Sequence, residues 1–293
     1  MAKMLQDYPG IKTVKGNKID LIRVLLTIGI VFLHATMTDL NYSTPGFKWV
    51  IKSVINVTMV CLPMFFAFSG YLFFRNVTDD PQSSWFWSKL RKRFSSLFIP
   101  FIIANCVAFM AYFTTLKVFP SMISGFLGND WKDPGFVLWK GPINLSLWFI
   151  RELIKLTILT PIIFIVIKHL KWWSVLFLGV MWKLGICPEP LFWYSSGVCL
   201  SIWKIAPIEK WLYSRSHLPV SSRAWTFFIY LYHYLLIIGI KKSLVLWIEP
   251  RNTFSQVSVY LASAIGTLAI LTAVYALMRR IIPRITSVIV GGK

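Results

Sequence analysis

The chain has 293 residues, of which 56% are hydrophobic and only 14% are charged, and its mean hydropathy is +0.64. A soluble domain carries about 25% charged residues, so this composition excludes an ordinary soluble domain. The formal net charge is +20. The basic residues lie in short loops between apolar stretches, which is typical of a membrane protein rather than of nucleic-acid binding. We therefore expect one polytopic membrane domain over residues 1–293 and no nucleic-acid partner.

Apolar stretches of about 20 residues, the length that crosses a bilayer, recur along the whole chain. They predict an all-α integral membrane fold with a bundle of about eight transmembrane helices. The predicted spans are residues 19–37, 54–74, 96–115, 147–167, 172–187, 190–204, 224–247 and 255–278. The fifth and sixth are short for a bilayer, and they are expected to form either a re-entrant pair or a tight hairpin around residues 187–190.

The basic residues also predict the orientation. With the N-terminus in the cytoplasm, 19 of the 31 Lys and Arg residues fall on the cytoplasmic side and 6 in outer loops. This bias predicts two cytoplasmic termini, with residues 1–18 as a polar cytoplasmic segment. The four cysteines, without C-x-x-C spacing, are expected to be small buried hydrophobes rather than disulfides or metal ligands, and no metal site is predicted.

The first span carries a line of polar side chains. Arg23 and His34 are eleven positions apart, which leaves them about 20° apart on one face of an α-helix. Asp20 and Thr27 fall on the same stripe. A rise of ~1.5 Å per residue places His34 roughly 16 Å above Arg23. Ionisable residues at membrane depth are costly and usually serve a function, so this line marks the candidate site.

Several ordered blocks of this chain resemble acyltransferase family 3, a family of bacterial membrane enzymes that O-acylate glycans. The first block is the R-x10-H pattern of Arg23 and His34 together with Asp20. The further blocks, in family order, are residues 62–74 with Ser69-Gly70-Tyr71, residues 85–105 with Arg93 and Pro100, residues 147–154, and residues 227–236. Many members are longer, so the resemblance widens the expected count to eight to ten spans.

The resemblance implies a multi-pass O-acyltransferase of the bacterial inner membrane, surrounded by membrane lipids. Its donor would be cytoplasmic acyl-CoA, most simply acetyl-CoA, with no permanently bound cofactor. Its acceptor would be a hydroxyl of a cell-surface polysaccharide or of its lipid-linked glycan precursor. The first, second, third and seventh spans are expected to line the site.

The residue roles follow from this resemblance. His34 is expected to deprotonate the acceptor hydroxyl as it attacks the thioester, with a covalent acyl-His relay as the alternative. Asp20 and Arg23 can pair as i, i+3 neighbours and complete the predicted catalytic group. The cations expected to bind the donor's phosphates are Arg91, Lys92 and Arg93, with Ser69 as a further donor contact. The acceptor-side candidates are Glu152, Trp148, Tyr230 and His233.

Plainer interpretations stand beside these. The three basic residues at 91–93 could be an ordinary cytoplasmic anchor, and Ser69-Gly70 a contact between helices. Glu152 could simply pair with Arg151 and Lys155, and His233 could bond to a neighbouring helix. A transporter or flippase of glycan or lipid precursors is the rival function, because polar residues inside spans also suit a substrate pathway. A non-catalytic membrane subunit is a third possibility.

Overall fold

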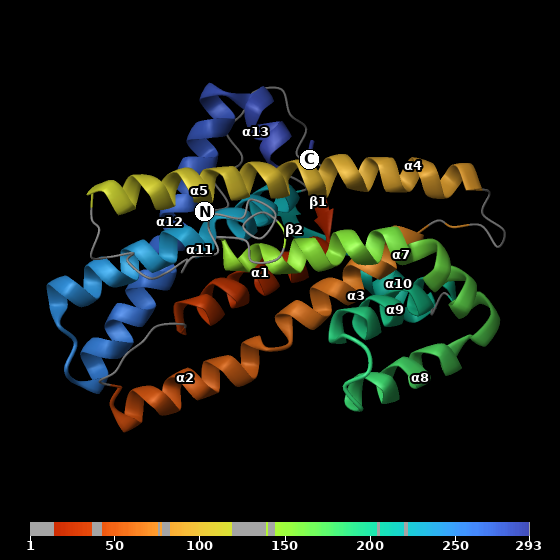
Figure 1. Cartoon of the computed structure of the whole chain (residues 1–293), viewed down its shortest axis with the longest axis horizontal. Coiled ribbons are helices and arrows are strands. Elements are labelled where there is room, and N and C mark those ends of the chain that lie inside the picture. Colours follow the sequence, from red (N-terminus) through yellow and green to blue (C-terminus); the bar gives the residue numbers. More distant parts are fainter. Residues whose placement is uncertain are drawn as a thin grey trace.

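A computed structural model describes residues 15–36, 43–75, 77, 83–118, 139, 144–203, 206–219 and 222–292 (Figure 1). Its helices are α1 (Lys18–Thr36), α2 (Pro45–Thr58), α3 (Cys61–Phe74), α4 (Ser83–Arg93), η2 (Phe94–Phe98), α5 (Ile99–Val118), η5 (Leu145–Leu147), α7 (Trp148–Leu170), α8 (Trp172–Lys183), α9 (Glu189–Ile202), α10 (Ala206–Leu212), α11 (Ser222–Ile248), α12 (Thr253–Ile281) and α13 (Pro283–Ile289). Most of the predicted N-terminal segment, residues 1–14, lies outside the described residues.

Six helical segments in this part of the chain are long and apolar enough to cross a membrane. They are Lys18–Thr36, Pro45–Phe74, Ser84–Thr114, Leu145–Leu170, Ser222–Ile248 and Thr253–Ile281. Two of them begin about ten residues before the predicted spans, because α2 runs on into α3, and α4 runs through the π-helix η2 into α5. The helical membrane fold is thus as predicted, and the count of eight spans stays a prediction.

Helices α8 and α9 take the place of the short fifth and sixth spans. They have 12 and 14 residues, which corresponds to about 18 and 21 Å, less than the roughly 30 Å of a hydrocarbon core. The chain turns back between them and α9 then packs along α3 (Figure 1). A Cβ on Gly70 of α3 would lie 2.2 Å from the carbonyl oxygen of Tyr194, and one on Gly197 of α9 would lie 1.9 Å from that of Ala67. Two glycines therefore let these backbones touch, as in other close helix pairs in membranes.

The expectation of a purely helical chain missed a small sheet. Strand β1 (Lys15–Asn17) pairs antiparallel with β2 (Arg215–Pro219), and the two strands directly precede α1 and α11. Both strands are too short to show an alternating pattern, so periodicity could not reveal them. The backbone amide of Lys18 also donates to Ser214. The sheet therefore brings the first turns of α1 and α11 together although some 200 residues separate them.

Helices α1, α11 and α12 form one packed group. Side-chain contacts at both ends show that α1 and α11 run in the same direction, and α12 returns beside them. Tyr260 of α12 donates to the carbonyl of Phe32 on α1, and Trp225 of α11 donates to Thr272 on α12. Buried apolar side chains from all three helices fill the space between them. The polar line of α1 is thus held against α11.

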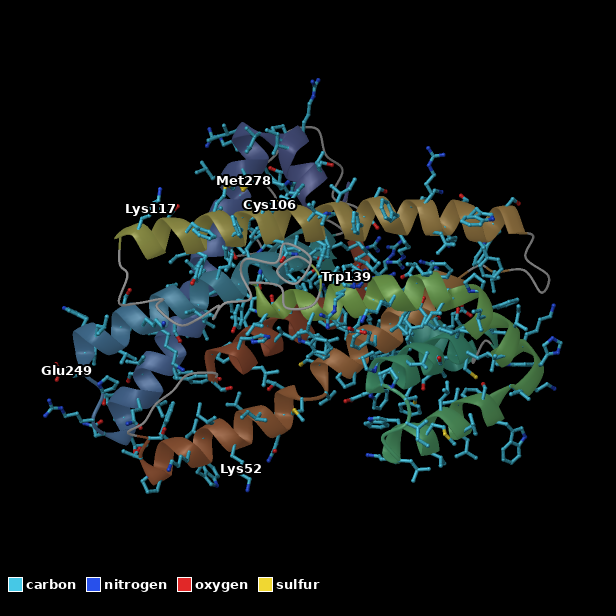
Figure 2. All side chains as sticks on the ribbon, in the orientation of Figure 1. Lys52, Cys106, Lys117, Trp139, Glu249 and Met278 are labelled. Atoms are coloured by element: carbon cyan, nitrogen blue, oxygen red, sulfur yellow. The ribbon has the colours of Figure 1, made fainter. Side chains whose placement is uncertain are left out.

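The burial of the four cysteines agrees only in part with the expectation from the sequence. All four cysteines lie in described residues and are free thiols; Cys61 and Cys199 are buried, as expected, but Cys106 is exposed on α5 (Figure 2). His169, in the last turn of α7, and His217, on β2, are both exposed.

Candidate functional site

The polar line on α1 has a buried start and a partly open end. Asp20 is 1% exposed, whereas Arg23 and His34 are half-buried. Thr27 lies between them, fully buried, and its hydroxyl has no hydrogen-bond partner within the described residues. His34 is in the last turn of α1. One helix therefore carries two separate polar regions, which we call the arginine end, around Asp20 and Arg23, and the histidine level, around His34.

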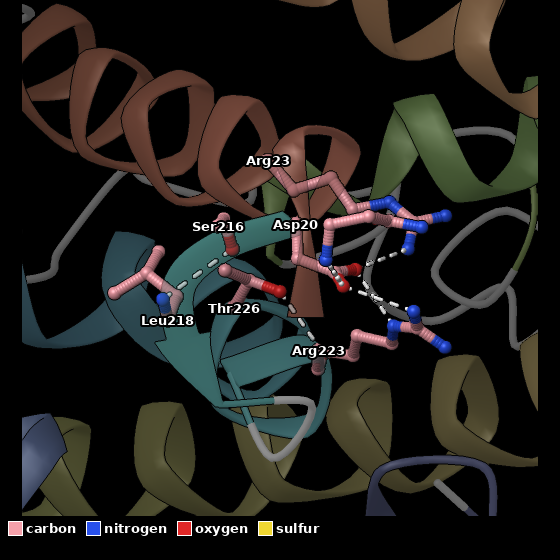
Figure 3. Close-up of polar contacts among 7 residues, drawn as sticks. Asp20, Arg23, Ser216, Leu218, Arg223 and Thr226 are labelled. Carbon is pink, nitrogen blue, oxygen red and sulfur yellow. Dashed lines mark hydrogen bonds and ion pairs between the residues drawn. The ribbon is translucent and has the colours of Figure 1, made fainter. Parts of the chain in front are cut away.

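At the arginine end, Asp20 is the centre of an ion-pair network (Figure 3). Its carboxylate accepts hydrogen bonds from Nε and Nη2 of Arg223, at 2.6 and 2.9 Å, and from the backbone amide of Asn17 at 3.1 Å. Nη1 of Arg23 lies 3.6 Å from the same carboxylate, as its i, i+3 spacing predicts. A bidentate arginine and a backbone amide satisfy a carboxylate that would be costly to bury alone.

More cations surround Arg23. Arg93, at the end of α4, and Arg223 both lie close enough for their charges to act on Arg23. Arg75, at the end of α3, lies over the ring of Tyr213, 3.9 Å from its centroid. Burial raises the pKa of the Tyr213 phenol, which therefore stays neutral beside these arginines. Asp20 pairs with Arg23 and Arg223, and the charge of Glu209 acts on Tyr213. Four arginines against these two carboxylates leave the arginine end with an excess of positive charge.

The three basic residues at the end of α4 do not act alike. Arg93 is partly buried and close enough to Arg23 for its charge to act there, whereas Arg91 and Lys92 are exposed. Arg91 and Lys92 thus have the placement of an ordinary surface anchor. On α3, Ser69 is half-buried, and its neighbour Gly70 provides the close contact with α9. The helix-contact interpretation of this pair is therefore correct for Gly70.

At the histidine level, two histidines come together. The rings of His34 and His233 have centroids 5.1 Å apart, and the ring of Tyr234 lies 5.2 Å from His34 on an almost perpendicular plane. His233 is fully buried. Its Nδ1 lies 2.9 Å from the carbonyl oxygen of Tyr230 and 3.1 Å from that of Ile229, while its Nε2 is buried without a partner in the described residues.

Residues 144–146 brace α11 beside this histidine pair. Asn144 donates from Nδ2 to the carbonyl of Leu231 at 2.7 Å, and the hydroxyl of Tyr230 donates to the carbonyl of Ser146. Ser146 in turn donates to Oδ1 of Asn144 at 2.7 Å. All these polar groups are buried and bonded, so Tyr230 has a structural task at the histidine level.

A buried lysine closes the end of α1. Lys241 of α11 is 2% exposed, and its ammonium donates to the carbonyl of Ala35, the residue after His34. The last carbonyls of a helix lack internal partners and attract a positive charge. Lys241 therefore fixes the turn that carries His34 against α11.

The remaining acceptor-side candidates lie on α7. The Glu152 carboxylate accepts from Arg151 at 3.0 to 3.1 Å and from Lys155 at 2.8 Å, which is the ion pair that the sequence indicated. Trp148 is half-buried and packs near Phe66 of α3. These bonds of Glu152 are to residues of its own helix.

Sequence reasoning missed three residues of this arrangement: Arg223, Lys241 and Asn144. Arg223 and Lys241 flank or interrupt an apolar span, and a charged residue within a span is itself a signal of function. Asn144 carried no such signal. No group of three His, Cys, Asp or Glu side chains in the described part of the chain could hold a metal ion.

Comparisons with known proteins agree with the resemblance. Residues 17–207 match the model of a family described as an acyltransferase domain, acyltransferase family 3. The chain is also similar to the succinoglycan biosynthesis protein ExoH of Rhizobium meliloti, with 25% identity over 209 residues, covering 63% of this chain and 54% of that protein. This chain thus matches about half the length of the curated relative. No solved structure matches it.

Proposed function

The chain belongs to acyltransferase family 3, and we propose that it moves an acyl group, most simply acetyl, from cytoplasmic acyl-CoA to a hydroxyl of a cell-surface polysaccharide or of its lipid-linked precursor. The name of the relative, a succinoglycan biosynthesis protein, supports a polysaccharide acceptor. The family match favours this function over a transporter of the same precursors. The proposed location is the inner membrane of a bacterium.

One observation carries the proposal: Arg23 of the cation cluster and His34 of the histidine pair lie on one helix, about 16 Å apart along its axis. The donor is a long molecule with several phosphates at one end and a thioester at the other. Arg23 and Arg93 supply charge and hydrogen bonds for the phosphates. The thioester would then reach His34 along the stripe, where the buried hydroxyl of Thr27 can bond to an amide of the donor's arm.

His34 acts on the reacting atoms. It takes the proton of the acceptor hydroxyl while that oxygen attacks the thioester carbonyl carbon. A carbon–oxygen bond forms, the carbon–sulfur bond breaks, and the proton passes from His34 to the departing sulfur. The products are the O-acyl glycan and free coenzyme A. An acyl-His relay needs the same residue and differs only in the order of these bonds.

The other predicted residues receive narrower roles. Asp20 lies 14 residues before His34, about 21 Å along the helix, so it acts through Arg23 as a positioning residue. Arg91, Lys92 and Ser69 are left as secondary donor contacts, because the first two are exposed and the last adjoins the α3–α9 contact. Trp148, Tyr230 and Glu152 shape the acceptor side, and His233 acts beside His34.

Two measurements on the donor, the transfer of its labelled acetyl group and the release of its thiol, test this function. Membranes with and without the protein receive acetyl-CoA labelled in the acetyl group, and the release of free thiol is followed at the same time. An acyltransferase moves the label into the glycan or lipid-linked fraction and releases one thiol for each acetyl transferred. Release of thiol without labelled glycan would mean hydrolysis, and precursor movement without thiol release would support the transporter; either result contradicts the proposal.

A further inference from the structure

The hydrogen bonds of His233 determine which of its nitrogens carries the proton. Nδ1 faces two backbone carbonyl oxygens, those of Ile229 and Tyr230, and a carbonyl can only accept. Nδ1 must therefore be the protonated nitrogen. A buried cation without a carboxylate partner is costly, so the ring is neutral and Nε2 is an acceptor with a lone pair. The tautomer of His233 is thus set by its own helix.

In the described part of the chain, this lone pair accepts no hydrogen bond. His233 is fully buried, and its Nε2 has no hydrogen-bond partner among the described residues. An unsatisfied buried polar atom costs free energy and needs an explanation. The neighbouring ring of His34, with its centroid 5.1 Å away, is also an imidazole and can donate a hydrogen bond. At this centroid separation, two ring nitrogens that point toward each other come within hydrogen-bond distance.

The proposed reaction creates a hydrogen-bond donor on His34, beside the Nε2 acceptor of His233. A neutral imidazole has one N–H group, and an imidazolium has two. When His34 takes the hydroxyl proton it gains an N–H group, and the buried Nε2 of His233 is an acceptor on the neighbouring ring, in a site shielded from water. Resting enzymes often hold such bonds long or poorly aligned, and they tighten only during the reaction.

We propose that His233 is a positioning residue whose Nε2 accepts the second N–H of His34 when His34 becomes protonated. This inference rests on the proposed function, since it assumes that His34 is the base. In the reaction, His233 neither gains nor loses a proton. It holds the imidazolium of His34 by one hydrogen bond, as a carboxylate does beside the histidine of other catalytic groups.

The test compares two substitutions at one position. His233→Phe keeps the ring's shape and removes both nitrogens, whereas His233→Gln can place an amide oxygen near the position of Nε2. The matched control is His169→Phe, the same change at an exposed histidine outside the site. Each protein is purified in detergent, its unfolding temperature is measured, and kcat and KM are determined with acetyl-CoA and a lipid-linked glycan fraction extracted from host membranes.

We expect His233→Phe to lower kcat by about 10- to 100-fold, the effect of one hydrogen bond to a charged group, with both KM values unchanged. His233→Gln should recover part of kcat, and His169→Phe should equal the wild type. A raised acceptor KM with unchanged kcat would assign His233 to acceptor binding and overturn the inference. Unchanged kinetics in both His233 variants would overturn it too. A wild type that transfers no acetyl group would instead refute the proposed function itself.

Discussion

The buried carboxylate of Asp20 accepts two hydrogen bonds from Arg223, a residue 203 positions later in the chain. The strands β1 and β2 pair directly before these residues, so the sheet and the ion pair join the same two helix starts. Helices α1 and α11 then run side by side to the histidine level. The contact at the arginine end therefore sets the register in which His34 meets His233.

Breaking this ion pair should destabilise the fold. Arg223→Gln leaves the buried Asp20 carboxylate with the backbone amide of Asn17 and the more distant Arg23. We expect a loss of about 3 kcal/mol, the lower end for a broken buried pair. The measurement is thermal unfolding in detergent. The double variant Asp20→Asn with Arg223→Gln removes both charges and should recover most of the loss. A double variant less stable than the single one would show that the pair does not act as a unit.

Substitution of the two arginines at the end of α4 should change the affinity for the donor to different extents. Arg93 is partly buried near Arg23, and Arg91 is exposed. We expect Arg93→Ala to weaken acetyl-CoA binding by about 10- to 100-fold, as for the loss of a charge-assisted bond to phosphate, and Arg91→Ala to change it by less than about 2-fold. Isothermal titration of each purified variant gives both values. Equal weakening by the two substitutions would place the phosphates outside the bundle instead.

The α3–α9 contact should depend on its glycines. Gly70→Ala would force a methyl group against the backbone of Tyr194, at 2.2 Å, so the two helices must separate. We expect a loss of stability of about 1 to 3 kcal/mol, typical of overpacking. Gly239→Ala on α11 is the control, because its methyl group would meet no atom within 4 Å. That control should be neutral or slightly stabilising, since alanine favours a helix. Similar unfolding temperatures for both variants would show that the helices do not touch.

Lys241 should matter more for catalysis than for stability. Lys241→Met removes the bond to the Ala35 carbonyl and frees the last turn of α1, but it also removes a costly buried charge. We expect kcat for acetyl transfer to fall about 10-fold, as for one lost bond to a charged donor, with a small change in unfolding temperature. The exposed Lys242→Met is the neighbouring control. A strong loss of stability with kcat intact in the folded fraction would reverse this assignment.

The sequence predicted the parts that a single helix encodes. The stripe of Asp20, Arg23 and His34 follows from helical spacing alone, and so does the Asp20–Arg23 pair. The short fifth and sixth spans also predicted that α8 and α9 form a re-entrant pair or a tight hairpin, because their lengths are insufficient for a bilayer. Apolar length, spacing and charge are local properties, so they can be read along the chain.

Contacts between distant segments could not be predicted in this way. The pairing of β1 with β2, the Arg223 bond to Asp20 and the Lys241 bond to Ala35 each join residues about 200 positions apart. The meeting of His34 and His233 depends on how α1 and α11 pack, and no spacing within either helix reveals it. The different directions of Arg91 and Arg93 likewise follow from packing against the bundle.

The most direct test of the account is acetyl transfer by the His34→Ala variant. Membranes containing the wild type, His34→Ala or the exposed control His169→Ala, at matched expression, receive radiolabelled acetyl-CoA, and the label is counted in the glycan and lipid-linked fractions. Transfer by the wild type and by His169→Ala, with none by a normally folded His34→Ala, is the predicted result. Equal transfer by all three would contradict the account and leave His34 with a packing role.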